Sequence, residues 1–455
     1  MAIDRRYTSW SEGLLWKNIS IAPLVSLRVL FGFLMAWSII RFASKGWIEE
    51  LYVKPQFFFT YYGFDWVQPW GASGMYVLFG LLLLSSLGIL FGCFYRLSAL
   101  SFFLLFTYVE FIDKTNYLNH YYFVSLFSFL LIWVPAHRRM SIDVWLKPSL
   151  ALKDVPAWTV NMFKFQLGIV YVFAGLAKLN PDWLFRAMPL KLWLPSASDT
   201  AIIGPLLDYE WMAYLFSWSG ALYDLTIVFF LLYKPTRWIA YTGVVLFHVM
   251  TAMLFQIGMF PWIMMCLTLI FFPAESHEAF WRRFGRWWQK GLDVAKGQTE
   301  RIAYRSFIKT ALLAYFLLQL LVPNRFLLYP GSLFWTEQGY RFSWRVMLME
   351  KAGYTTFTVT DRMDQRKEWV DNNEFLTPQQ EKMMSTQPDM ILQYAHHLAE
   401  VYEKKGFNDP IVQCNSRVTL NGVRSQLFID PEVDLSKQKR GFRHKEWILP
   451  QKKDQ

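Results

Sequence analysis

Residues 211–233 read WMAYLFSWSGALYDLTIVFFLLY and carry a single charged side chain, Asp224. A helix needs about 20 mostly apolar residues to cross the hydrocarbon core of a bilayer. This run meets that requirement, so we predict that it crosses a membrane as a helix. The run VNMFKFQLGIVYVFAGLAKL at residues 160–179 is similar in character, and it carries Lys178 next to its last position.

The same criterion predicts further membrane-spanning helices on both sides of these two runs. Of the 455 residues, 54% are hydrophobic and only 18% are charged, whereas a soluble domain carries about 25% charged residues. Several of the apolar segments are short, so we expect eight or nine crossings. The segments are 21–42, 74–94, 98–112, 120–136, 160–179, 211–233, 238–255, 258–273 and 310–323.

The polar C-terminal part has a different pattern, which is typical of a small α+β domain. The segment TTFTVTDR at 355–362 predicts a strand, and PDMILQYAHHLAEVYEKKG at 388–406 has the apolar spacing of a helix. The segment VTLNGVRSQLFID at 418–430 predicts a hairpin that turns at Asn-Gly. We therefore expect an all-α polytopic membrane domain at 1–323, followed by an extramembrane α+β domain at 324–455.

The distribution of Lys and Arg predicts the orientation, because cytoplasmic loops of membrane proteins are enriched in both. With a cytoplasmic N-terminus and nine crossings, the loop 274–309 lies inside and alone carries more Lys and Arg than all outside loops together. The C-terminal domain then lies outside. We expect an integral protein of a bacterial inner membrane, whose net charge of +11 reflects topology and implies no nucleic-acid partner.

Ionisable side chains within apolar spans are candidates for function because they are costly in a bilayer. Lys178 is either a functional amine or an anchor that reaches to the interface; burial would favour its neutral form, which accepts a proton. Asn119 and His120 end the polar segment DKTNYLNH, which alternatively is a turn with an Asn cap and a solvated His. Asp224 and His248 are predicted to pair structurally, Asp224 with Arg28 or Arg41.

Four segments together resemble the vitamin K-dependent gamma-carboxylases. They are DKTNYLNHYY (113–122), FAGLAKLNPDW (173–183), FHVMTAMLFQIGMF (247–260) and YRFSWRVMLMEK (340–351). They follow the family's order, and weaker similarity continues to about residue 450. The similarity ends where the animal enzymes continue, so the resemblance is to a shorter, bacterial-type member.

The resemblance implies an enzyme that oxygenates reduced vitamin K to its epoxide and uses the strong base so formed to carboxylate glutamate in a protein. Its co-substrates are reduced vitamin K, O2 and CO2, with no metal. By the same resemblance, Lys178 is the catalytic base and His120 a further catalytic residue. Asn119 binds near the quinone, and Tyr340 belongs to a segment linked to the glutamate substrate.

Two alternatives remain beside this interpretation. The first is a quinol epoxidase that does not carboxylate, and the second is a non-enzymatic transporter or lipid-binding protein. Inverted repeats and interrupted helices would indicate a transporter, and the sequence shows neither. The expected partners are the lipid bilayer, an isoprenoid quinol and a glutamate-containing peptide or protein.

Overall fold

The computed structural model describes residues 12–201, 203–255, 257–283 and 304–452. All nine segments that were predicted to cross the membrane contain a helix in the structure. These helices are α1 (Ala22–Ser44), α2 (Gly71–Phe91), α3 (Tyr95–Ile112), α4 (Asn119–Trp133), α6 (Trp158–Lys178), α9 (Glu210–Leu232), α10 (Arg237–Leu254), α11 (Phe260–Thr268) and α14 (Arg305–Asn324).

Seven helices within the described residues are long and apolar enough to span a bilayer. The count becomes eight if the bent pair Phe260–Phe271 and Ala274–Arg283, which meet at 117°, forms one span. The exact number of crossings stays a prediction. Shorter helices outside the C-terminal sheet and its covering helices are α5 (Ile142–Leu146), α7 (Pro181–Arg186), α8 (Leu190–Trp193), α12 (Ala274–Arg283) and α15 (Leu333–Thr336).

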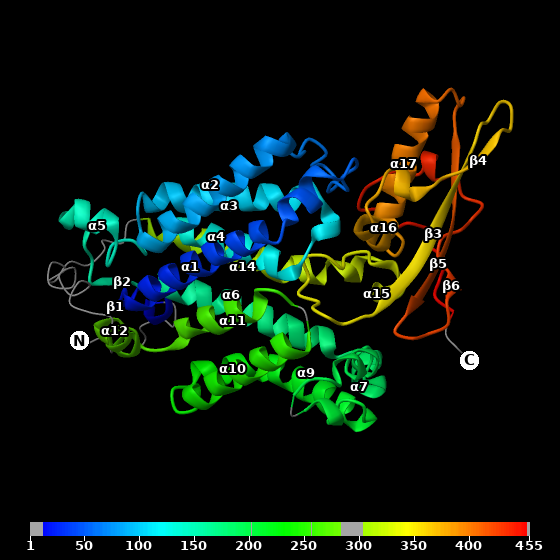
Figure 1. Ribbon diagram of the computed structural model, residues 1–455. Helices are drawn as coiled ribbons and strands as arrows, with labels where there is room; N and C mark the ends of the chain where they lie inside the picture. The colour runs from blue at the N-terminus through cyan, green and yellow to red at the C-terminus, as the bar shows by residue number, and fades with distance from the viewer. Residues whose placement is uncertain (1–11, 202, 256, 284–303, 453–455) are drawn as a thin grey trace, which may run out of the picture.

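The long helices run between two ends of the molecule that differ in structure (Figure 1). One end carries α5, α12 and a two-stranded sheet of β1 (Asn18–Ser20) and β2 (Asp154–Pro156). The C-terminal domain covers the other end. Segments that were predicted to be cytoplasmic thus meet away from the C-terminal domain, although most of the loop 274–309 lies outside the described residues.

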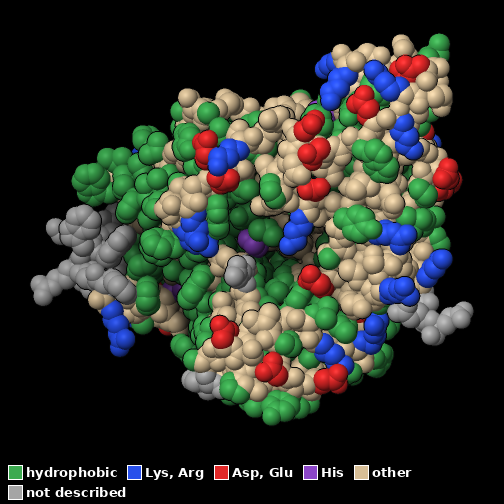
Figure 2. All heavy atoms as spheres, turned by 45° about the vertical axis from the view of Figure 1, so that its right-hand side comes forward, with side chains coloured by type: hydrophobic (Ala, Val, Ile, Leu, Met, Phe, Trp, Pro, Cys, Tyr) green, Lys and Arg blue, Asp and Glu red, His purple; other side chains and the backbone are tan. Residues whose placement is uncertain are grey.

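The two parts of the molecule also differ in their surfaces (Figure 2). Apolar side chains dominate the helical part in this view, whereas Lys, Arg, Asp and Glu are spread over the C-terminal domain. Large side chains such as Leu84, Ile239 and Leu321 are exposed on the helices, at 65%, 77% and 57%. A continuous apolar surface of this kind indicates contact with lipid.

The helices α6 and α9 pack closely because α6 has a glycine at their contact. A Cβ atom at Gly175 would lie 2.8 Å from the backbone nitrogen of Leu225 and 2.7 Å from its Cγ atom. No side chain larger than hydrogen fits there without moving the helices. Close approach at this point brings the last turn of α6 beside the middle of α9, where Asp224 lies.

The C-terminal domain contains the predicted strand, helix and hairpin. Its antiparallel sheet has the order β4-β3-β5-β6, formed by β3 (Lys351–Thr360), β4 (Lys367–Trp369), β5 (Ile411–Leu420) and β6 (Gln426–Leu427). The β5–β6 hairpin turns at Asn421 and Gly422, both with positive φ. Helix α17 (Pro388–Lys404), preceded by α16 (Pro378–Met384), buries its apolar face against this sheet.

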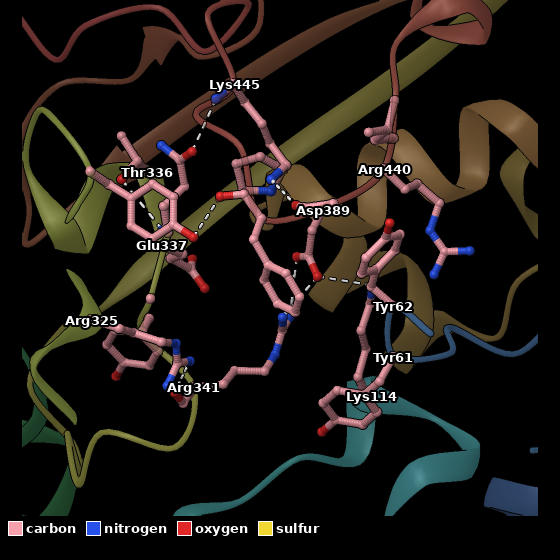
Figure 3. A pocket seen from close by; sticks show the side chains of 18 of the residues that line it. Tyr61, Tyr62, Lys114, Arg325, Thr336, Glu337, Arg341, Asp389, Arg440 and Lys445 are labelled. Atoms are coloured by element: carbon pink, nitrogen blue, oxygen red, sulfur yellow. Dashed lines mark hydrogen bonds and ion pairs between the residues drawn. The ribbon is translucent and has the colours of Figure 1, made fainter. Parts of the chain in front are cut away.

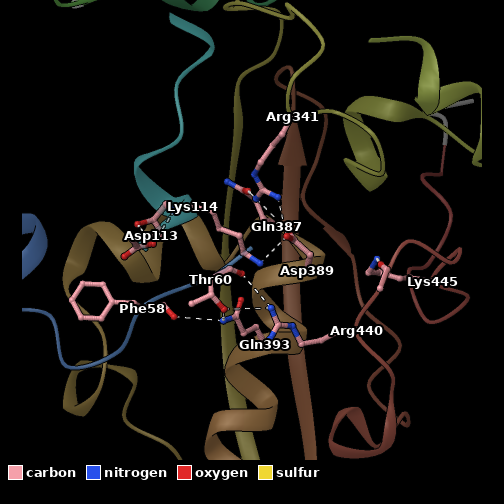
Figure 4. A network of polar contacts seen from close by, with 12 residues as sticks. Phe58, Thr60, Asp113, Lys114, Arg341, Gln387, Asp389, Gln393, Arg440 and Lys445 are labelled. Atoms are coloured by element: carbon pink, nitrogen blue, oxygen red, sulfur yellow. Dashed lines mark hydrogen bonds and ion pairs between the residues drawn. The ribbon is translucent and has the colours of Figure 1, made fainter. Parts of the chain in front are cut away.

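Buried polar contacts join the two parts of the chain (Figure 4). Asp389 of α17 accepts ion pairs from Lys114 of the helical part and from Arg341, both at 2.8 Å. The Gln393 amide donates to the Thr60 hydroxyl at 3.0 Å. The C-terminal domain therefore packs directly against the loops at this end of the helices.

Candidate functional site

An apolar cavity of about 110 Å³ lies at the C-terminal end of α6. Its walls come from the six helices α6 to α11, and residues Val346 and Met347 of the C-terminal part also line it. Lys178, Asp224, His248 and Tyr171 supply its main polar groups. Mostly apolar walls with a few convergent polar groups are typical of a site for a small organic ligand.

Lys178 and Asp224 form a buried ion pair in this cavity. The Lys178 ammonium lies 2.5 Å from the Asp224 carboxylate, and the two residues are only 7% and 5% exposed. The interpretation of Lys178 as an anchor reaching into solvent is therefore wrong. The predicted pairing of Asp224 with Arg28 or Arg41 is also wrong.

Arg28 satisfies its charge in another way. It is fully buried, and its guanidinium donates to the backbone carbonyl of Met140 at 2.5 Å and to that of Ile89 at 3.4 Å. Backbone carbonyls carry partial negative charge, so they compensate part of the cost of burying the cation. Asp224 thus remains available to Lys178.

The sequence after Lys178 fixes the surroundings of its side chain. Helix α6 ends at Lys178, and the Asn180 side chain then caps α7 by accepting from the Trp183 backbone N–H at 3.0 Å. Pro181 occupies the first position of α7, which suits its fixed φ. This sharp turn places the Trp183 ring 5.5 Å from the Lys178 ammonium, in a cation–π contact.

A second polar pair in the cavity consists of His248 and Tyr171. The Tyr171 hydroxyl and His248 Nε2 lie 3.2 Å apart, and His248 is 4% exposed. A structural pairing was predicted for His248 from the sequence, without its partner. Its place in FHVMTAMLFQIGMF, one of the segments that carry the family resemblance, is the signal that could have connected it to the site.

Asn119 and Tyr340 converge on one backbone carbonyl. The Asn119 amide donates to Arg345 O at 2.9 Å, and the Tyr340 hydroxyl donates to the same oxygen at 3.3 Å. Asn119 does not cap α4, whose N-cap residue is Leu118 and makes no side-chain cap bond. Neither Asn119 nor Tyr340 lines the Lys178 cavity. Their hydrogen bonds position Arg345, and the next residue, Val346, lines that cavity.

His120 is buried behind the cavity wall. It is 8% exposed, and its ring stacks on Phe260 with centroids 5.6 Å apart. Phe260 lines the cavity, but His120 does not. The solvated-cap interpretation of His120 is therefore wrong, and one aromatic ring separates His120 from the cavity.

The segment 340–347 has an unusual backbone. Phe342, Trp344 and Met347 all have positive φ, at 59°, 59° and 53°, a region that L-residues other than Gly, Asn and Asp rarely adopt. The Phe342 N–H donates to the Tyr117 hydroxyl at 2.7 Å, and Trp344, 1% exposed, stacks on Tyr122. Backbone strain held by surrounding contacts concentrates at functional sites.

The cavity thus combines a buried ion pair, Lys178 and Asp224, with a second hydrogen-bonding pair, His248 and Tyr171. The apolar walls exclude competing water, which strengthens electrostatic interactions inside. Such a site can take a proton from a weakly acidic hydroxyl and hold the resulting anion. No group of three or more His, Cys, Asp or Glu is placed to hold a metal ion within the described residues.

Two family models match this chain and together cover most of it. The HTTM domain matches residues 16–275, which include Lys178, Asp224 and His248. The lumenal domain of vitamin K-dependent gamma-carboxylase matches residues 304–454.

The chain belongs to the vitamin K-dependent gamma-carboxylase family. The similarity that four short segments indicated therefore extends over both the helical part and the C-terminal part of the chain. No solved structure matches it. Val346 and Met347, which line the Lys178 cavity, lie within the match to the lumenal domain.

Proposed function

We propose that the chain is a membrane enzyme that oxygenates reduced vitamin K, or a related isoprenoid quinol, to the epoxide and couples this reaction to carboxylation of glutamate in a peptide. The observation that supports this proposal best is the buried Lys178–Asp224 pair in an apolar cavity. A quinol ring with its hydroxyl groups has the shape and polarity for such walls. The family membership supplies the reaction class.

Lys178 acts in this proposal as the base that takes a proton from a quinol hydroxyl, once the proton that it shares with Asp224 has passed to the carboxylate. Before the transfer, one proton is shared by the amine and the Asp224 carboxylate, and the pair is neutral as a whole. After the transfer, the pair holds two protons and one positive charge, which faces the quinol anion. The low-dielectric surroundings strengthen this attraction, so Asp224 allows the site to store the proton without an isolated buried charge.

The overall reaction balances with the named reactants alone. Quinol and O2 give epoxide and water, so the quinol is oxidised and oxygen is reduced. The glutamate γ-carbon loses a proton, which is finally released to solvent, and its electron pair forms the bond to the carbon of CO2, which yields the second carboxyl group. His248 and Tyr171 offer hydrogen bonds to the quinol oxygens, and Val346 and Met347 add apolar surface to the cavity wall.

A quinol epoxidase without carboxylation is the second candidate. It is favoured by one observation: Tyr340, in the segment linked to the glutamate substrate, does not line the Lys178 cavity. The groups placed around that cavity suffice for quinol deprotonation, whereas a glutamate side chain must enter from outside it.

Both candidates are tested in one experiment. The purified chain is incubated with vitamin K hydroquinone, O2, labelled bicarbonate and a glutamate-containing peptide, and both epoxide and fixed label are measured. We expect both products in a fixed ratio. Epoxide without fixed label would support the epoxidase, and neither product would support a non-enzymatic lipid-binding protein.

A further inference from the structure

A second cavity, of about 150 Å³, lies where the C-terminal domain meets the loops of the helical part. We call it the basic interface pocket. Its cationic lining residues come from four separate segments of the chain, one of which supplies two of them (Figure 3). They are Lys114, Arg325, Arg341, Arg440 and Lys445, and the carboxylates that accompany them are Glu337 and Asp389.

Three of these cations have carboxylate partners. Asp389 is shared by Lys114 and Arg341, each at 2.8 Å. Arg440 pairs with Asp65, outside the pocket lining, at 2.8 Å. Glu337 forms an ion pair with Lys351, also at 2.8 Å. It therefore pairs with none of the five cations that line the pocket.

Arg325 and Lys445 have no carboxylate partner within the part of the chain that the structure describes. Arg325 donates to the carbonyl of Val322 at 3.0 Å and to that of Arg341. The Lys445 ammonium donates only to the Gly441 carbonyl, at 3.4 Å. Both side chains are half-buried. Burial lowers the pKa of Lys445, as does nearby Arg341, and Asp389 opposes this shift in part; a further anion would stabilise its charged form.

Some residues that line the basic interface pocket are near neighbours in the chain of residues that line the Lys178 cavity. Tyr340, Arg341 and Phe342 line the basic interface pocket, and Val346 and Met347 line the Lys178 cavity. Three residues lie between Phe342 and Val346, so their Cα atoms, four chain steps apart, are at most about 14 Å apart. A separation of this size corresponds to about four residues of extended peptide.

We propose that the basic interface pocket binds a carboxylate of an acidic peptide substrate, and that this carboxylate belongs to a second acidic residue rather than to the glutamate that reacts. This inference rests on the proposed function for the identity of the peptide as substrate. Lys445 and Arg325 are the residues that recognise the second carboxylate, because their charges are not already neutralised. The enzyme would then prefer peptides in which two acidic residues lie a few positions apart.

Equilibrium binding of two matched peptides to the purified full-length protein in detergent tests this proposal. One peptide carries two Glu residues, and the other has Gln in place of one of them; both carry the same uncharged fluorophore. Hydrogen bonds to charged groups are strong enough to give the two-Glu peptide at least about a tenfold lower Kd. Lys445→Met should remove this advantage and leave binding of the Glu/Gln peptide unchanged.

Lys439→Met is the matched control, because Lys439 is exposed on the same loop and does not line the pocket. It should preserve the preference for the two-Glu peptide. Equal weakening of both peptides by Lys445→Met, or no weakening at all, would overturn the proposal. So would complete displacement of the two-Glu peptide by an equal concentration of free glutarate, which would indicate a site for small anions.

The binding measurement needs neither quinol nor turnover. Failure of the proposed function would appear as absence of epoxide and fixed CO2 in the reaction assay. Failure of the pocket proposal would appear as equal affinity for the two peptides. The two outcomes are therefore distinguishable in the same protein preparation.

Discussion

At the residue scale, the central feature is a pair of opposite charges inside a membrane-spanning helical domain. Lys178 and Asp224 lie 2.5 Å apart and are almost completely buried. Replacing a buried pair by apolar residues is often neutral or stabilising, so such a pair is weak evidence for a role in stability. Its place in a cavity favours a role in chemistry instead.

We predict that breaking this pair destabilises the protein more than removing it. Asp224→Asn leaves the Lys178 ammonium buried beside a neutral amide, and loss of one partner of a buried pair costs about 3–5 kcal/mol. The double variant Lys178→Met/Asp224→Leu should recover most of this loss but show no quinol turnover. Thermal unfolding in detergent measures the stability of both variants. A single variant as stable as the unmodified protein would contradict the buried pairing.

The sequence identified the individual residues of this site better than their partners. Lys178, Asp224 and His248 were recognised because a polar group in an apolar run is conspicuous. Asp224 was paired with the wrong cations because Lys178 is 46 positions away and no periodicity connects two separate helices. Likewise, nothing in the residues around Asn119 indicated that its amide binds the carbonyl of Arg345.

At the scale of elements, the packing of α6 on α9 determines whether the pair can form. The contact depends on Gly175, where a Cβ atom would meet backbone and side-chain atoms of Leu225. Hydropathy predicted both helices within a few residues of their observed bounds, because the length of an apolar run is written in the sequence. Hydropathy did not predict which helices touch, because the apolar side chains of a membrane helix can contact either lipid or another helix.

We predict that Gly175→Ala separates α6 from α9 and impairs both stability and quinol turnover. A Cβ atom at position 175 would lie 2.8 Å from the Leu225 nitrogen, so the helices must shift. Gly168→Ala on the same helix is the control, because its Cβ atom would meet only Val228 Cγ1 at 3.5 Å, an ordinary contact. The temperature of thermal unfolding and the rate of epoxide formation should both fall in Gly175→Ala. Both should stay unchanged in Gly168→Ala. Equal behaviour of the two variants would show that the close approach is unimportant.

At the scale of the whole molecule, Asp389 connects the C-terminal domain to the helical part. Burial raises the pKa of Asp389, but Arg341 and Lys114 outweigh this effect, and the pKa is lowered well below the usual range. Burial lowers the pKa of Lys114 to about 8, although Asp389 opposes the shift. Asp389 therefore stays ionised throughout the physiological range and holds both cations in place.

We predict that Asp389→Asn loosens the C-terminal domain. The substitution leaves Lys114, which is 4% exposed, without its ion-pair partner, and an unpaired buried charge is costly. Hydrogen exchange in the segments 57–62 and 113–119 should increase. Asp409→Asn is the control, since Asp409 pairs at the surface with Arg362 and Lys437 and such pairs contribute about 0–1 kcal/mol. Unchanged exchange in Asp389→Asn would mean that other contacts suffice to hold the domain.

The arrangement of the two parts could be predicted only in outline. The shift from apolar to polar composition indicated where the membrane part ends, and the hairpin and helix of the C-terminal domain followed from their patterns. The basic interface pocket could not be predicted from the sequence, because its lining combines residues as far apart in the chain as Lys114 and Lys445. Only the folded arrangement shows that their charges are close and incompletely neutralised.

The account depends most on Lys178 as the base that activates the quinol. The direct measurement is epoxide formation from vitamin K hydroquinone by the purified protein and by Lys178→Ala, with quinol binding measured in parallel. Lys164→Ala, which removes another lysine of α6 that does not line the cavity, is the control. General bases contribute about 10²–10⁴-fold to rate, so Lys178→Ala should lose at least a hundredfold in epoxide formation while it still binds quinol and Lys164→Ala stays active. Near-normal epoxide formation by Lys178→Ala would contradict the account.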